Sequence, residues 1–114
     1  MQTNAAFPAF DREDLLLRLG QDTALAAQIL EMTIEELEEQ GPAIEVALAR
    51  GNLAVGRELA HSLKGVTANT SAIGLSDLAA QIENACRGSD LVLARELASC
   101  LSPETVRFKK AIAA

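Results

Sequence analysis

The sequence predicts an all-α protein, an antiparallel four-helix bundle with one short additional helix at its N-terminal end. Apolar residues recur every three or four positions along each long segment, which is the period of an amphipathic helix. No segment shows the strict alternation of a half-buried strand. Apolar residues make up 49% of the 114 residues but aromatics only 3%, so aliphatic side chains must build the core. Short connections between long helices favour antiparallel neighbours.

The N-terminal residues 1–9 show little pattern, and we predict that they form a flexible arm before a single domain of residues 10–114. Asp11 is a helix-capping residue and should begin a short first helix. Gly20 should end that helix, because glycine readily adopts the left-handed conformation found after helix ends.

The second helix should begin after Asp22 and run to about Arg50. Gly41–Pro42 interrupts it, and proline inside a helix costs about 3 kcal/mol. The apolar stripe nevertheless keeps its phase across the interruption, which predicts one kinked helix rather than two. The stripe consists of Ala26, Leu30, Thr33, Leu37, Gln40, Ile44 and Ala47.

Three further helices follow a turn at Gly51–Asn52. The third is predicted over about residues 53–70 and the fourth over about residues 75–87, where Gly88 ends it. The last should be capped by Ser89 or Asp90, and its stripe again keeps phase across a proline, here Pro103. That stripe consists of Leu91, Ala94, Ala98, Leu101, Thr105, Phe108 and Ile112.

The charge balance narrows the classes of partner. The net charge is −6 at pH 7, a poor match to the phosphate backbone of nucleic acid. No apolar run approaches the length of a membrane span. We therefore expect a protein partner rather than nucleic acid or a membrane. Cys86 and Cys100 are interpreted as free thiols in apolar surroundings rather than a disulfide, and the sequence holds no metal-ligand cluster.

The third predicted helix carries the only histidine of the chain, His61. At about 100° per residue, its apolar residues fall on one side and His61 on nearly the opposite side. The apolar side consists of Leu59, Leu63, Val66 and Thr70, and the opposite side of Arg57, His61, Lys64, Gly65 and Ala68. On helix geometry alone, an exposed histidine without a role is an equally good interpretation.

The neighbours of His61 favour a phosphoryl acceptor. Lys64 and Arg57 lie on the same face within reach, where a cation can offset the charge of a phosphorylated imidazole; Arg57 is also explained as an ordinary solvated residue. Gly65 costs the helix about 1 kcal/mol relative to alanine. Folding does not require glycine at this position, whereas the close approach of another protein would. Ala68, one turn further, extends this surface strip of small residues.

The run Ala60–Val66 (AHSLKGV), followed by Asn69 and Leu75, resembles the signature of histidine-containing phosphotransfer (HPt) domains of multistep two-component phosphorelays. The resemblance covers most of the chain, including the Asp-capped second helix and the Gly-Asn turn before the histidine helix. It continues into the next helix with the Leu78…Ile82-Glu83 pattern. It implies a monomeric, cytoplasmic phosphotransfer protein without kinase activity of its own.

The resemblance also implies roles for individual residues. His61 would accept a phosphoryl group on Nε2 from the aspartyl phosphate of one response-regulator receiver domain and pass it to another, and Lys64 would stabilise the phosphorylated form. Arg57, Gly65 and Ala68 would meet the receiver. Glu83 would accept a hydrogen bond from Nδ1–H, although a solvated surface residue is an equal alternative. The protein would need no cofactor of its own, because the receiver supplies Mg²⁺.

Two departures from the family pattern and two alternatives remain at this point. Ala68 and Ser71 stand where many HPt domains carry glycine. A non-catalytic helical adaptor would make His61 incidental. A dimerising histidine kinase domain normally carries an acidic residue directly after its histidine, whereas Ser62 follows here. The sequence fits a stand-alone protein and the terminal module of a hybrid sensor histidine kinase equally well. It indicates neither the receivers nor the direction of phosphoryl flow.

Overall fold

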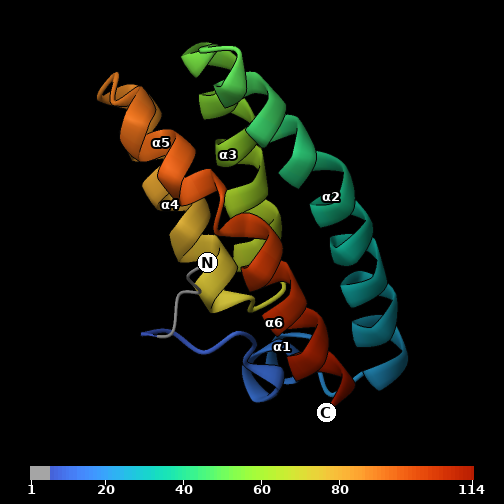
Figure 1. Cartoon of the computed structure of the whole chain (residues 1–114). Coiled ribbons are helices and arrows are strands. Elements are labelled where there is room, and N and C mark those ends of the chain that lie inside the picture. Colours follow the sequence, from blue (N-terminus) through green and yellow to red (C-terminus); the bar gives the residue numbers. More distant parts are fainter. Residues whose placement is uncertain (1–5) are drawn as a thin grey trace.

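The computed structural model describes residues 6–114, and within that range every regular element is a helix (Figure 1). The prediction of an all-α protein is confirmed. No helix in the described range is long and apolar enough to cross a membrane. The helices are α1 (Arg12–Arg18), α2 (Thr23–Ala49), α3 (Leu53–Asn69), α4 (Ile73–Arg87), α5 (Leu91–Ala98) and α6 (Leu101–Ala113).

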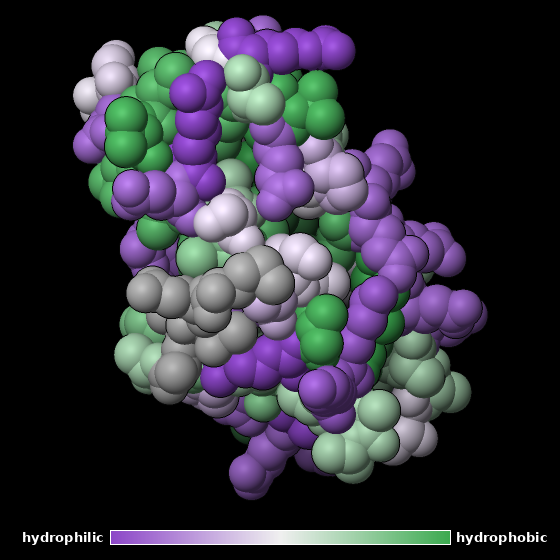
Figure 2. Space-filling model, in the orientation of Figure 1, coloured by the Kyte–Doolittle hydropathy of each residue, from purple (hydrophilic) through white to green (hydrophobic). Residues whose placement is uncertain are grey.

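The helices form an elongated bundle of about 42 × 23 × 20 Å. α3 packs against α2 on one side and α4 on the other, while α5 and α6 follow one another and complete the bundle by contacting both α2 and α4. α1 lies at the end of the bundle where α6 ends (Figure 1). At the opposite end, where α5 begins, hydrophobic side chains reach the surface (Figure 2), and Val92 is 68% exposed there.

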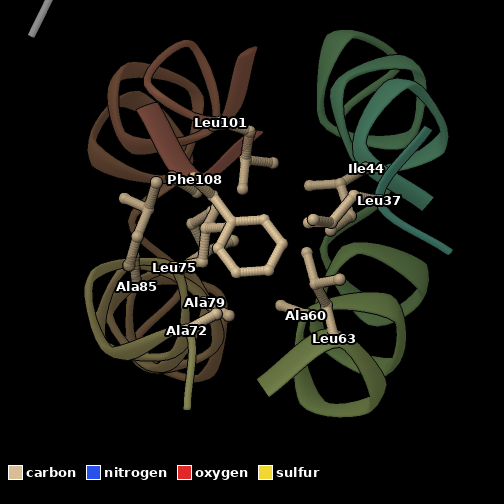
Figure 3. Close-up of a cluster of buried hydrophobic side chains, with 14 of the residues drawn as sticks. Leu37, Ile44, Ala60, Leu63, Ala72, Leu75, Ala79, Ala85, Leu101 and Phe108 are labelled. Carbon is tan, nitrogen blue, oxygen red and sulfur yellow. The ribbon is translucent and has the colours of Figure 1, made fainter. Parts of the chain in front are cut away.

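Side chains from α2, α3, α4 and α6 meet in one core (Figure 3). Phe108 of α6 is fully buried and points to the centre, between Leu37 and Ile44 of α2 and Leu75 of α4. An aromatic ring is the largest apolar group that this aliphatic composition offers. Phe10, just before α1, meets the ring of Phe108 edge-on at 5.8 Å between ring centres, so the N-terminal helix is joined to the same core.

α2 is one continuous helix across Pro42, as predicted. The predicted stripe matches the buried side of this helix with two differences. Gly41 is buried where Gln40 was expected and Gln40 is only half-buried, and Leu48 is buried next to Ala47. Glycine has no side chain to place, so the helix can turn this position inward without displacing a neighbour.

The prediction of one last helix is wrong, because α5 ends at Ala98 and α6 begins at Leu101. Pro103 has no N–H group, and its ring would clash with the carbonyl of Ser99 in a continuous helix. In the first turn of α6 neither problem arises, because the N–H groups of a first turn have no carbonyl acceptor within their own helix. Both helices keep their apolar residues toward the core, which is why the stripe stays in phase.

α4 begins at Ile73, two residues earlier than predicted. Ala72 precedes it and provides no side-chain cap. The backbone N–H of Gly74 instead donates to the carbonyl of Pro8 at 3.0 Å, and Arg107 donates to the carbonyl of Phe7. Within the predicted arm of residues 1–9, the segment 1–5 lies outside the described residues, and the remainder lies against α4 and α6.

α1 is held against the bend between α3 and α4 at Ser71. Asp11 caps α1 as predicted, and its N–H donates to the Ser71 carbonyl at 3.0 Å. The Ser71 hydroxyl donates to Asp14 at 2.8 Å and accepts from Arg18 at 2.5 Å. Ser71 has a φ of +57°, which costs a non-glycine residue roughly 1–2 kcal/mol. These hydrogen bonds explain how serine is accommodated at a bend whose left-handed backbone favours glycine.

We expect Ser71→Ala to lower the free energy of unfolding by about 1–2 kcal/mol, because the left-handed backbone stays while both side-chain hydrogen bonds are lost. Chemical denaturation measures this. Ser62→Ala is the control, since Ser62 is exposed on α3. Equal denaturation midpoints for Ser71→Ala and wild type would show that α1 is not held through this side chain.

Candidate functional site

His61 lies on the exposed face of α3, with 68% of its side chain accessible. Arg57, Gly65 and Ala68 are exposed on the same face and Lys64 is half-buried, as the helical period predicted. The buried side of α3 differs from the prediction. It consists of Gly56, Ala60, Leu63 and Thr67, followed by Thr70, whereas Leu59 and Val66 are only half-buried.

The shift in the buried side of α3 has a physical cause. Thr67 is buried because its hydroxyl donates to the carbonyl of Leu63 at 2.7 Å, which leaves only its methyl group to pack. Gly56 is buried because its neighbours come too close for a side chain, and a Cβ there would lie 2.7 Å from Leu48. An apolar pattern drawn from large hydrophobic residues includes neither Thr67 nor Gly56. The face that carries His61 is unaffected.

Glu83 of α4 is buried directly beside His61, with only 4% of the residue exposed. Its Oε2 lies 2.8 Å from Nδ1 of His61, and its Oε1 lies 2.7 Å from Nζ of Lys64. The interpretation of Glu83 as a solvated surface residue is therefore wrong. The hydrogen bond from Lys64 and, after it, the one from His61 lower the pKa of Glu83 against the opposing effect of burial.

The ionised state of Glu83 determines how His61 can bond. A carboxylate only accepts hydrogen bonds, so the nitrogen facing it, Nδ1, must carry the ring hydrogen. In a neutral imidazole the other nitrogen, Nε2, then holds a lone pair. The arrangement can thus present an accessible nucleophilic nitrogen on a rigid helix, with an ammonium group one helical turn away.

Arg87 is a member of the site that the sequence did not single out. Its Nη2 lies 3.3 Å from Oε2 of Glu83, the same oxygen that faces His61. The available signal was the spacing of Glu83 and Arg87, four residues apart on one helix, which commonly forms an ion pair. Arg57 and Arg87 line the hollow beside His61. In the described part of the chain Arg57 makes no ion pair, so its guanidinium remains available there.

Gly65 has open space where a side chain would stand. A Cβ built on it would meet no atom within 4 Å beyond its own helix, in contrast to Gly56. Ala68, one turn further, is exposed. The packing of this chain therefore gives no reason for glycine at position 65, and the surface from His61 to Ala68 is free of large side chains on this strip.

The described residues contain no group of three or more His, Cys, Asp or Glu side chains that could hold a metal ion. Cys86 is buried and Cys100 half-buried, and both are free thiols. Burial raises the pKa of the Cys86 thiol, which keeps it protonated and unreactive.

We expect Gly65→Ala to raise the free energy of unfolding by about 0.5–1 kcal/mol, because alanine is the better helix former and finds no obstacle there. Gly56→Ala is the matched control on the same helix. Its Cβ meets the buried Leu48 and should lower stability by about 1–3 kcal/mol. Thermal unfolding measures both, and a destabilised Gly65→Ala variant would mean that folding does require glycine at this position.

Comparison with known protein families matches most of this chain to a family model. The family model of the Hpt domain matches residues 28–114, which includes α3, α4 and every residue of the site described above. Neither the curated proteins nor the solved structures give a significant match.

Proposed function

Since this chain belongs to the Hpt domain family, whose members are phosphotransfer modules of two-component systems, we propose that it is a phosphorelay intermediate. His61 accepts a phosphoryl group from the aspartyl phosphate of one response-regulator receiver domain and passes it to the aspartate of another. The contact of Nδ1 with Glu83 at 2.8 Å carries this proposal, because it leaves Nε2 free on an exposed face.

The transfer needs little from this chain beyond a positioned nucleophile. The lone pair of His61 Nε2 attacks phosphorus, the bond between phosphorus and the aspartyl oxygen breaks, and its electrons return to the carboxylate. The reverse sequence delivers the group to the next receiver. Mg²⁺ held by the receiver stabilises the charge of the phosphoryl group during transfer, so the chain needs no cofactor of its own and acts without kinase activity.

Lys64 serves the phosphorylated state. Its side chain is 37% exposed, and its ammonium is anchored to Glu83 on one side. An ammonium carries three hydrogens, so it has donors left for a phosphoryl oxygen on the neighbouring imidazole. Charge-assisted hydrogen bonds of this kind are about twice as strong as neutral ones. Lys64 thereby stabilises the phosphohistidine without leaving the buried carboxylate.

Gly65 and Ala68 provide the surface on which the receiver docks, with Arg57 at its edge. The nucleophile must come within about 3–3.5 Å of phosphorus, and the phosphoryl group sits in the active site of the receiver. The loops around that active site must therefore come close to α3. A strip without large side chains permits this approach. In the antiparallel four-helix arrangement that we propose, α2 and α4 pack against α3 and hold it beneath this surface.

Phosphotransfer is tested by incubating the protein with phosphorylated receiver domains of its host and Mg²⁺. We expect an acid-labile, alkali-stable label on the protein, which is the behaviour of phosphohistidine, and we expect no label on His61→Gln. If wild type takes no label from any receiver of the host, the protein is a helical adaptor and the proposal fails.

Gly65→Gln should slow transfer from the receiver by about tenfold or more, because a long side chain on the strip keeps the reacting atoms apart. Circular dichroism should show unchanged helix content, since a side chain has room there. Ala27→Gln, an exposed substitution on α2, is the control and should transfer at the wild-type rate. Normal transfer by Gly65→Gln would refute docking across this strip.

A further inference from the structure

We propose that Glu83 keeps the proton on Nδ1 of His61 while Nε2 carries the phosphoryl group, so that the phosphorylated residue stays an imidazolium poised to release it. Glu83 is then a positioning residue for the second half of the relay, the donation step. This inference rests on the proposed function. It adds a factor that determines how readily the phosphoryl group leaves Nε2 again.

The geometry fixes the carboxylate against the ring nitrogen. Oε2 of Glu83 lies 2.8 Å from Nδ1, a distance typical of a charge-assisted hydrogen bond. Lys64 at 2.7 Å and Arg87 at 3.3 Å bind the same carboxylate. Only 5% of the Glu83 side chain is exposed, so water has little access to the carboxylate and competes weakly with the ring for Oε2. The contact is therefore built into the pairing of α3 with α4.

The chemistry makes the Nδ1 proton important. When the lone pair of Nε2 forms the bond to phosphorus, both ring nitrogens are substituted and the ring becomes positively charged. It can lose that charge only by giving up the Nδ1 proton. If the proton has gone, breaking the P–N bond must expel an anionic imidazolate. If the proton has stayed, the electrons of the bond return to Nε2 and a neutral imidazole leaves.

The charges around the ring determine whether the proton stays. Arg57 and Lys64 of α3 and Arg87 of α4 are cationic and favour its loss. Glu58 of α3 is anionic but exposed, and lines the hollow beside the ring. Glu83 is the one carboxylate among these groups in direct contact with Nδ1. Because the interaction of two charges weakens with distance and with solvent between them, the contact with Glu83 dominates.

No proton then needs to move in either direction of the relay. The imidazole that attacks carries hydrogen on Nδ1, the phosphorylated ring carries the same hydrogen, and the imidazole that leaves carries it still. A glutamine in place of Glu83 would still accept the hydrogen bond but would lack the negative charge. The difference between Glu and Gln at this position therefore isolates the effect of charge on the lifetime of the phosphohistidine.

The experiment phosphorylates wild type and Glu83→Gln chemically with phosphoramidate, without any receiver. Phosphorus NMR then follows the loss of the group from about pH 5 to pH 9. We expect wild type to lose it about tenfold faster than Glu83→Gln near pH 8, which corresponds to a shift of about one pH unit between the two profiles. Glu58→Gln removes a nearby carboxylate that does not touch the ring, and its profile should match wild type.

A second measurement needs wild type alone and so does not depend on the folding of a variant. Nitrogen NMR of the phosphorylated protein reports directly whether Nδ1 is protonated, and assignment is unambiguous because His61 is the only histidine. Protonated Nδ1 near pH 8 supports the proposal. Unprotonated Nδ1 in wild type, or coinciding pH profiles for wild type and Glu83→Gln, overturns it. Failure of every receiver to transfer would instead refute the relay function and leave this result standing.

Discussion

The site depends on one buried carboxylate that the fold must compensate. An ionised side chain in a protein interior is costly unless charged or hydrogen-bonding partners surround it. Glu83 finds these partners in His61 and Lys64 from α3 and in Arg87 from its own helix. The residues proposed to bind and stabilise the phosphoryl group are therefore positioned by the same charge that they neutralise. A change that separates α3 from α4 would disturb both stability and chemistry.

Close packing of α3 and α4 is what brings the short side chain of Glu83 under the imidazole. Gly56 of α3 comes so near α4 that a Cβ on it would lie 3.4 Å from Sγ of Cys86. Ala60, one turn before Lys64, is fully buried on the inner side of the same helix. Small residues on the inner side of α3 thus place its outer side at hydrogen-bonding distance from Glu83. Gly56 and Gly65 therefore differ in their surroundings on one helix. Neighbouring side chains occupy the space where a side chain of residue 56 would stand, whereas the corresponding space at residue 65 is open.

The sequence predicted the helices well because their apolar period is local information. The period could not distinguish one last helix from two, since α5 and α6 both face the core and share one phase; only the geometry of Pro103 separates them. Likewise, His61, Lys64 and Gly65 share a face by helical spacing alone. Glu83 lies on another helix, and its place beside His61 followed from family resemblance rather than from spacing. The pairing of Glu83 with Arg87 has the spacing of an ordinary surface ion pair, so nothing marked it as part of the site.

The net charge of this protein is negative, whereas the side chains around His61 are mostly positive. The proposed chemistry depends on these local charges. The chain carries a net charge of −6, yet three cations lie around His61, of which Arg57 and Arg87 are exposed and Lys64 is half-buried. The one carboxylate in contact with the ring is buried, where solvent and salt screen it least. In the relay that we propose, an approaching phosphoryl group would meet these positive side chains, while the exposed imidazole interacts with a buried negative one. In that relay, this separation would let the same few residues stabilise the phosphoryl group on the outer side of the ring and keep the ring a good leaving group on its inner side.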